Sequence, residues 1–321
     1  MSYEVVFAKK YDISRLVESI SLDESLEEIA YRANLRLVVT PDMPVISPGQ
    51  ELRIGGIPFG QSRKENLFNP GVVWECNSTN AGSKHLSITA YEKTIYLAKS
   101  EDERLMPANQ TATERLKQYA KDWGIPVGNI ADTGKKLARS IKRSQTILSM
   151  IMGDLKETVD KGGAMYRVRM TERGLELAEI GRNKIVWELE AIQDVTQVRT
   201  LEGAITRVKV LGSQQNENWV AEPLAVKSKD TDKYGTLQKL ISDSNIKSKK
   251  QAEEAAAKML LGVQETYSVS SLDINTIRAG DRVRLNGLEL IVTRISHQLG
   301  DPGHMELELA AENKVRRDYL A

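Results

Sequence analysis

The histidines and the cysteine are the side chains of this chain best suited to chemistry near neutral pH. The 321 residues include three histidines and one cysteine. His297 and His304 flank the turn sequence QLGDPG, which places Asp301 between them. Two imidazoles and a carboxylate can hold a metal ion. No further ligand has a comparable placement, so ordinary strand-end histidines are the favoured interpretation and we predict no metal site.

A thiol–imidazole pair formed by Cys76 and His85 is a second candidate, since such a pair can act in nucleophilic catalysis. Cys76 lies in the alternating run VVWECNS, where a lone cysteine is typically a buried strand thiol. No oxyanion motif accompanies the pair, and a single cysteine excludes an intrachain disulfide. We therefore predict no catalytic residue and no cofactor.

Other catalytic motifs are missing from the sequence. It contains no P-loop, no G-x-S-x-G and no H-E-x-x-H. Neighbouring carboxylates such as Glu27 and Glu28 lie on polar faces, where solvation is the ordinary role. A glycosidase needs two carboxylates that the fold brings together, so a hydrolase stays open as an alternative.

Composition narrows the class of protein further. The length indicates two domains or more, and 40% apolar with 28% charged residues is typical of a soluble globular chain. A net charge of +1 provides no general attraction to DNA or to an anionic membrane. No apolar run is long enough to span a bilayer, and no apolar signal core follows Met1. We expect a chain made in the cytoplasm, without a signal peptide or a membrane span.

A short phrase occurs twice and is the strongest organisational signal. Residues 45–56 read VISPGQELRIGG, and residues 276–287 read TIRAGDRVRLNG. At a constant offset, Gly49 matches Gly280 and Arg53 matches Arg284. Each copy predicts a tight turn that leads into a half-buried strand. We interpret the two copies as the product of a duplicated β domain.

The expected fold class is mainly β with α insertions (α+β). Residues 1–104 predict a first antiparallel barrel, with period-two alternation over 31–39 and a strand pair at 86–97. The stretch SLDESLEEIA favours a strand, although Ser21 and Glu24 also have capping-box spacing. The polar residues 100–104 are interpreted as a linker.

Residues 105–160 predict a small, mainly helical domain. Thr111 and Glu114 have capping-box spacing before an amphipathic run that ends at Gly124, and Trp123 is interpreted as a core anchor. A second apolar helical face follows at 147–155.

Residues 161–321 predict a second barrel that carries a helical insertion at 236–262. Thr236 is expected to cap one helix, and Ser248 with Gln251 to cap an alanine-rich one that ends near Gly262. Its small side chains would let that helix lie close to a sheet or to another subunit. The charged end, residues 313–321, is expected to be partly free.

Several phrases in order along the chain resemble the tail hub (baseplate hub) proteins of contractile-tailed phages, defective prophages and phage-tail-like bacteriocins. The resemblance is strongest to those of Gram-positive hosts, of the defective Bacillus prophage type. It is carried by ITAYEKTIYLAKSEDE, TATERLKQYAKDWGIPVGNI, YGTLQKLI, IRAGDRVRLNGLELIVTRISHQ and MELELA.

The resemblance implies a structural, non-enzymatic hub located in the baseplate of a virion or tail-like particle. Family hubs are homotrimers whose two tube-type barrels per subunit join a six-fold tail tube to a three-fold spike. The implied partners are the tail tube, spike and baseplate wedge proteins, with DNA or a tape-measure protein passing through the lumen. Two alternatives stay open. Residues 105–160 could bind peptidoglycan, although the sequence motif of LysM modules is missing there, or the chain could be a cell-wall hydrolase.

Overall fold

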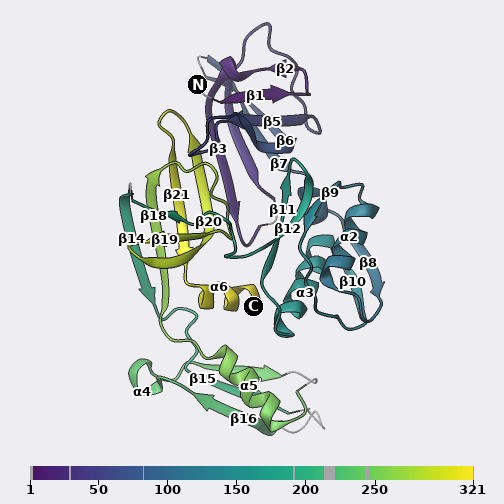
Figure 1. Ribbon diagram of the computed structural model, residues 1–321, viewed down its shortest axis with the longest axis vertical. Helices are drawn as coiled ribbons and strands as arrows, with labels where there is room; N and C mark the ends of the chain where they lie inside the picture. The colour runs from purple at the N-terminus through teal and green to yellow at the C-terminus, as the bar shows by residue number, and fades with distance from the viewer. Residues whose placement is uncertain are drawn as a thin grey trace. The chain divides into compact units, whose positions relative to one another are not determined.

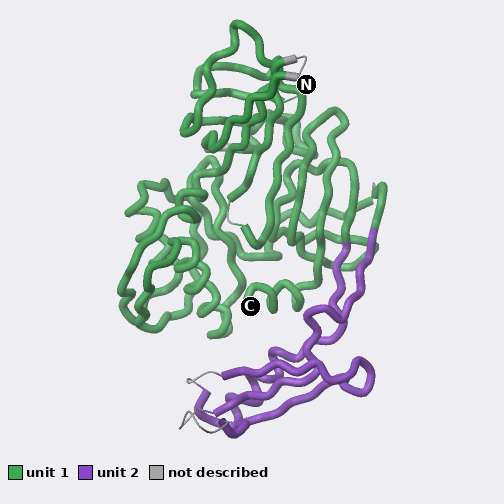
Figure 2. The backbone as a smooth tube through the Cα atoms, turned by 180° about the vertical axis from the view of Figure 1, so that it is seen from behind, with its two compact units in different colours: residues 1–195, 268–321 green, residues 196–267 purple. Residues whose placement is uncertain are grey.

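The structure is a computed structural model that describes residues 3–28, 30–81, 83–190, 192–212, 221–242 and 246–320. Residues 1–195 and 268–321 form one compact unit, and residues 196–267 form a second (Figure 2). The second unit is an insertion in the chain of the first, and each boundary falls within a strand, Ile192–Thr200 at one end and Gln264–Leu272 at the other. Each unit is described separately below.

The N-terminal part of the first unit is a run of antiparallel strands (Figure 1). These are β1 (Glu4–Phe7), β2 (Tyr11–Asp12), β3 (Val17–Ser25), β4 (Arg32–Val38), β5 (Glu51–Gly56), β6 (Glu65–Ala81) and β7 (Ser83–Glu92), with a 3₁₀ turn at Ser14–Leu16. In β4 the buried residues alternate as Ala33, Leu35 and Leu37, which confirms the predicted period of two. The favoured strand assignment for SLDESLEEIA is confirmed through Ser25.

A second set of strands continues the same sheet. They are β13 (Trp187–Glu188), β14 (Ile192–Thr200), β18 (Gln264–Leu272), β19 (Arg282–Leu285), β20 (Leu288–Leu299) and β21 (His304–Ala310). The order is β14-β18-β21-β20-β3-β4-β7-β6-β5-β1-β2, with β19 on β20 and β13 on β19. Among the described strands this order is an open path, so the mainly β class is established while the two barrels stay a prediction.

The predicted helices between residues 105 and 160 are present, together with strands that were not predicted. From residue 95 to residue 160 the elements are α1 (Ile95–Lys99), β8 (Glu101–Met106), α2 (Ala112–Asp122), β9 (Val127–Ile130), β10 (Ser140–Thr146) and α3 (Ile147–Asp160). The capping box of Thr111 and Glu114 is confirmed. Trp123 is partly buried and packs against the same apolar cluster as Tyr119 and Met150.

Two local assignments on either side of residue 100 were wrong. Residues 94–97 were predicted as a strand, but α1 begins at Ile95 and buries Ile95 and Leu97 against α3. Short apolar runs do not distinguish helix from strand by periodicity, and here packing decides. Most of the supposed linker belongs to β8, whose backbone pairs with β10. Residues 101–104 of β8 are all charged, so the sequence showed no apolar face there.

The C-terminal helix is a further correction. Residues 313–321 were expected to be partly free, but α6 (Glu312–Leu320) buries Val315. The hydroxyl of Tyr319 donates to the carbonyl of Tyr166 at 2.6 Å. Tyr166 belongs to a three-stranded sheet of β11 (Tyr166–Thr171), β12 (Gly174–Glu179) and β9. This hydrogen bond therefore connects α6 to the three-stranded sheet.

The second unit contains a small sheet covered by one helix. Its elements are β15 (Arg207–Leu211), β16 (Pro223–Ser228), α4 (Thr231–Tyr234), β17 (Gln238–Ser242) and α5 (Lys249–Met259), in the sheet order β16-β15-β17. The helix expected after Thr236 is wrong, because residues 238–242 pair in parallel with β15. The predicted cap of α5 is confirmed, and the helix ends before Gly262. Its buried alanines, Ala252 and Ala256, pack on Val208 and Val210 of its own sheet.

Candidate functional site

The structure does not bring the two candidate histidines together. His297 is fully buried, with Nδ1 2.6 Å from Asp273 Oδ1 and Nε2 2.9 Å from the carbonyl oxygen of Ile277. In the β20–β21 pair it lies opposite Met305, the residue after His304. Successive strand residues face opposite sides, so the two imidazoles point apart. Within the described ranges, no group of three His, Cys, Asp or Glu residues could hold a metal ion.

Cys76 and His85 also lie apart. They sit on paired strands, but Cys76 is opposite Ile88 and His85 is opposite Thr79. Nδ1 of His85 is 3.1 Å from a carboxylate oxygen of Glu18. Burial and the neighbouring Glu75 raise the pKa of the Cys76 thiol, which lowers its reactivity. The thiol–imidazole hypothesis is not supported by this geometry.

The repeated phrase has the same backbone geometry in both copies. The amide of Gly49 donates to the carbonyl of Val73 at 2.7 Å, and the amide of Gly280 donates to the carbonyl of Val292 at 2.7 Å. In the opposite direction, the amide of Val73 donates to the carbonyl of Gln50 in the first copy, and the amide of Val292 donates to the carbonyl of Asp281 in the second. Both glycines have left-handed backbones, with φ of +90° and +86°.

A side chain closes the turn in the same way in each copy. The amide of Ser47 donates to Oε1 of Gln50 at 2.7 Å, and the amide of Arg278 donates to Oδ2 of Asp281 at 2.9 Å. The turns are therefore local structural equivalents that use different residue types.

The equivalence extends into the strands that follow. Glu51 pairs with Val72 as Arg282 pairs with Ile291. The next ladder in each copy has a register shift at the equivalent position. In β6–β7 it lies between Val73 and Glu75, and in β20–β21 it lies between Val292 and Arg294. A bulge conserved between two copies of one unit is a strong structural match. The hypothesis of a duplicated β domain is thus supported by matching turns, by equivalent pairs beside the turn and by an equivalent bulge, while β5–β6 has two further register shifts that β19–β20 lacks.

A buried ionic cluster joins the second copy of the phrase to strands β3, β7 and β11. Glu24 of β3 accepts hydrogen bonds from Nε and Nη2 of Arg278 at 2.7 and 2.8 Å and forms an ion pair with Arg167 at 2.9 Å. Glu92, at the end of β7, lies 3.1 Å from Arg278. The Arg278 guanidinium also lies over the ring of Tyr31, 3.8 Å from its centroid. Buried charges require such mutual pairing because isolated charges are poorly solvated in a protein interior.

The two carboxylates of this cluster respond oppositely to their surroundings. Burial would raise the pKa of Glu24, but Arg167 and Arg278 outweigh it and hold the pKa far below its ordinary value. For Glu92 burial prevails over the attraction of Arg278, and the pKa is raised. Burial also lowers the pKa of Arg167 to about 10. The cluster connects strands that are far apart in sequence and so stabilises the first unit.

Comparison with known proteins identifies the family. The model of the YQBQ-like family matches residues 33–310. The chain belongs to the YQBQ-like family.

The relatives of this YQBQ-like chain come from Bacillus subtilis strain 168. The uncharacterized protein YqbQ is 30% identical over 225 residues, covering 67% of each chain. The phage-like element PBSX protein XkdQ is 29% identical over 157 residues, covering 48% of this chain and 47% of XkdQ. Among solved structures, the 43 kDa tail protein of prophage MuSo2 from Shewanella oneidensis superimposes over 100% of both chains, with a TM-score of 0.73 and 13% identity. The fold is thus that of a prophage tail protein.

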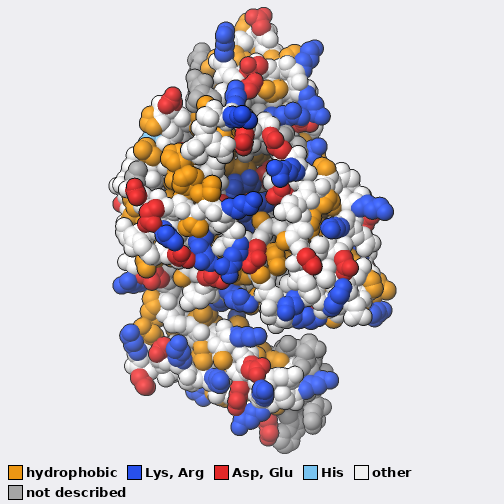
Figure 3. Space-filling view, in the orientation of Figure 1, with side chains coloured by type: hydrophobic (Ala, Val, Ile, Leu, Met, Phe, Trp, Pro, Cys, Tyr) orange, Lys and Arg blue, Asp and Glu red, His pale blue; other side chains and the backbone are white. Residues whose placement is uncertain are grey.

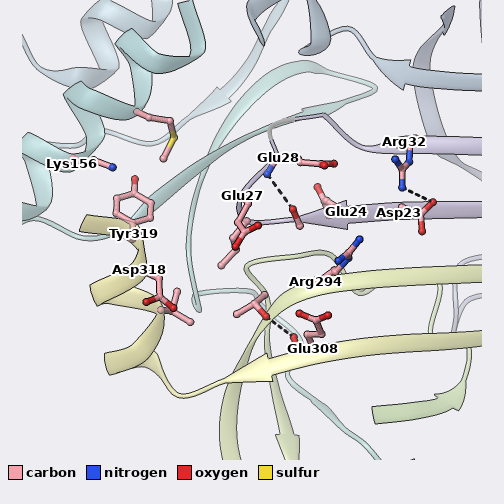
Figure 4. A pocket seen from close by; sticks show the side chains of 15 residues that line it. Asp23, Glu24, Glu27, Glu28, Arg32, Lys156, Arg294, Glu308, Asp318 and Tyr319 are labelled. Atoms are coloured by element: carbon pink, nitrogen blue, oxygen red, sulfur yellow. Dashed lines mark hydrogen bonds and ion pairs between the residues drawn. The ribbon is translucent and has the colours of Figure 1, made fainter. Parts of the chain in front are cut away.

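A cavity of about 350 Å³ lies beside Glu24 in the YQBQ-like chain (Figure 4). Its lining includes carboxylates of Glu27, Glu28 and Asp318 and the amino group of Lys156. A glycosidase acid would need a carboxyl with a raised pKa. Glu24 has a lowered pKa, and Glu92, whose pKa is raised, lines a different pocket, so this cavity offers no support for a hydrolase.

The residues of the ionic cluster were not identified by sequence reasoning. Arg278 was visible only as a member of the repeated phrase, and Arg167 only as one of the charges that alternate with apolar residues in β11. Charges on a strand ordinarily indicate a solvated face, and the long-range pairing that buries these has no local signature. On the face shown in Figure 3, positive and negative side chains are interspersed. Of the helices described, none is long and apolar enough to cross a membrane.

Proposed function

We propose that this chain is a structural baseplate hub, a homotrimer that forms a pseudo-six-fold ring between a tail tube and a spike. The observation that carries the proposal is the matched pair of β repeats in one chain, which share the turn, the strand pairs beside it and the bulge that follows. Three chains with two similar units each present six similar units in a ring. One component can then match six-fold and three-fold neighbours.

The comparisons support the same setting. XkdQ is named for a phage-like element, and the solved structure with the matching fold is a prophage tail protein. By the same reasoning the chain is a component of a virion or tail-like particle. We propose that its partners are the tail tube, spike and wedge proteins, and that DNA or a tape-measure protein passes through the lumen.

The finer organisation belongs to the same proposal. Residues 1–104 and 161–321 would each form a tube-type barrel in the assembly, and residues 105–160 a separate domain. The role is mechanical rather than enzymatic.

The assembly state tests the proposal. We would measure the mass of the full chain by analytical ultracentrifugation, alone and co-expressed with the tube protein of its own particle, and average images of the complex. The expected result is three chains in a ring with six similar lobes facing the tube. A stable ring with a different number of chains, or a chain that stays monomeric and fails to join the tube, would contradict it.

A further inference from the structure

Strand β20 uses one edge to hold two different strands. Its first half, from Leu288 to Ile291, pairs with β19. Its second half, from Arg294 to Leu299, pairs with β3 in the order Arg294 with Ser25 through Leu299 with Ile20. The opposite edge is taken by β21. We call strands β3 to β7 the first repeat, and strands β14 and β18 to β21 the second repeat. The β3–β20 ladder is therefore the place where the first repeat is joined to the second.

Strand β6 is the equivalent of β20 in the first repeat, and its corresponding edge is half empty. Residues 65–72 pair with β5, as the first half of β20 pairs with β19. When the two bulges are aligned, Glu75 corresponds to Arg294. Residues 75–80 of β6 then correspond to residues 294–299 of β20, which pair with β3. Among the described strands, residues 75–80 pair with β7 alone. All of them except Cys76 are exposed.

Strand β14 is the equivalent of β3 in the second repeat. In the first repeat β3 comes before β4 in the chain, and the sheet order is β3-β4-β7. In the second repeat β14 comes before β18 in the chain, and the sheet order is β14-β18-β21. Within the described part of the chain, β14 ends the strand order (Figure 1). Its residues from Gln193 to Thr200 are all exposed. Val195 and Val198 are 38% and 44% exposed. The second repeat thus offers the strand that the edge of β6 lacks.

These edges also lack the usual protection against pairing. Exposed edges in monomeric proteins are commonly blocked by lysine, proline or a covering segment. The segment 75–80 reads ECNSTN, with one charge at its start, and β14 reads IQDVTQVRT, with neither lysine nor proline. Both edges therefore remain competent to add a strand.

We propose that β14 of one copy of this chain pairs antiparallel with residues 75–80 of β6 in a second copy, in the register that β3 and β20 use within the chain. The inference rests on the proposed ring, because it supplies the contact between neighbouring subunits. Each chain donates one strand and accepts one, which is a head-to-tail contact of the kind that closes rings. In the shared register Cys76 corresponds to Ile295, which pairs with Glu24.

The lone cysteine makes the pairing directly testable. Single cysteines would be placed one at a time at positions 194–200 of the full chain, and each variant would be oxidised and run without reductant. A disulfide with Cys76 requires Cβ atoms about 3.5–4.5 Å apart. We expect interchain products, up to covalent trimers, at one or two positions that share a face of the strand. The starting chain, with Cys76 alone, should give none.

Matched controls separate pairing from random collision. Val226→Cys places a thiol on β16, another exposed strand with 43% exposure at this residue, and should give only background product. Adding Cys76→Ser to each reactive variant should remove the product. Equal products at all positions and at the control would overturn the pairing.

The mass of each sample before oxidation distinguishes the two proposals. A trimeric ring without the alternating cross-link pattern would overturn the β14–β6 pairing and leave the hub. The pattern in an assembly of another size would support the pairing and contradict the trimeric hub. A monomer without cross-links would contradict both.

Discussion

The two copies of the repeated turn share a backbone and differ in their surroundings. Around Gly49 the turn is exposed, and an added Cβ would meet no atom within 4 Å. Around Gly280 the turn is buried, and an added Cβ would lie 3.0 Å from Cδ of Arg167. Ser47 of the first copy is replaced by Arg278, which pairs with Glu24 and Glu92.

The difference shows which part of a duplicated unit was retained and which part was free to diverge. The backbone hydrogen bonds and the left-handed glycine define the turn in both copies, while the side chain two residues before the glycine differs: Ser47 lies in an exposed turn, and Arg278 ties the buried turn to Glu24 and Glu92. The second copy is packed against the first repeat within one chain. The following predictions test that contrast, beginning with the largest effect.

Replacing Glu24 should have the largest effect on stability. Glu24→Ala leaves Arg167 and Arg278 without their shared carboxylate, and breaking a buried pair costs about 3–5 kcal/mol. The free energy of unfolding, measured by urea denaturation, should fall accordingly, and Glu24→Gln serves if the alanine variant does not fold. Glu103→Ala, which removes an exposed pair with Arg143, should cost less than about 1 kcal/mol. Equal losses would mean that the cluster is not a junction.

The two glycines should differ when each is replaced by alanine. Gly49→Ala should lower the free energy of unfolding by about 1–2 kcal/mol, because alanine is strained in a left-handed backbone and its Cβ meets no other atom there. Gly280→Ala adds a contact with Arg167 in a packed interior, which typically costs about 1–3 kcal/mol more. Thermal or urea unfolding of the two variants gives the comparison. A larger loss for Gly49→Ala would contradict the contrast between an open and a buried turn.

The pH dependence of stability should report the two carboxylates separately. Because the pKa of Glu24 is lowered from its ordinary value of 4.5, its contribution is present above about pH 4.5 and is lost as the pH falls below it. Because the pKa of Glu92 is raised from 4.5, the folded state binds its proton more readily, and stability falls as the pH rises from that value. Each proton contributes up to about 1.4 kcal/mol per pH unit.

Urea denaturation of the starting chain and of Glu24→Gln across acidic pH measures this effect. The difference in free energy between the two should shrink as the pH falls from about 5 to about 3. A constant difference would show that the charge of Glu24 is not what stabilises the junction. Glu92→Gln should remove the decline above pH 4.5 and leave the acid limb unchanged.

Features with a local cause were predictable from the sequence. The alternation of Ala33, Leu35 and Leu37 indicated β4, and the capping boxes at Thr111 and Ser248 indicated the starts of α2 and α5. These signals arise from hydrogen bonds and side-chain periods within a few residues. Elements without an apolar face in the sequence were missed, among them β8, which begins with four charged residues and is held to β10 by backbone pairing. The strand β17 was mistaken for a helix because its identity depends on pairing with β15.

The sequence by itself determined the repeat, the strand periods, the helix caps and the absence of a recognisable catalytic motif, since each is written in neighbouring residues. Only the tertiary structure decided that His297 is buried against Asp273, that Glu24 lies between Arg167 and Arg278, and that β3 occupies the edge of β20. Strand edges and buried charges find their partners across long stretches of chain. Their selection depends on which groups the folded interior removes from water, and no short stretch of sequence records that.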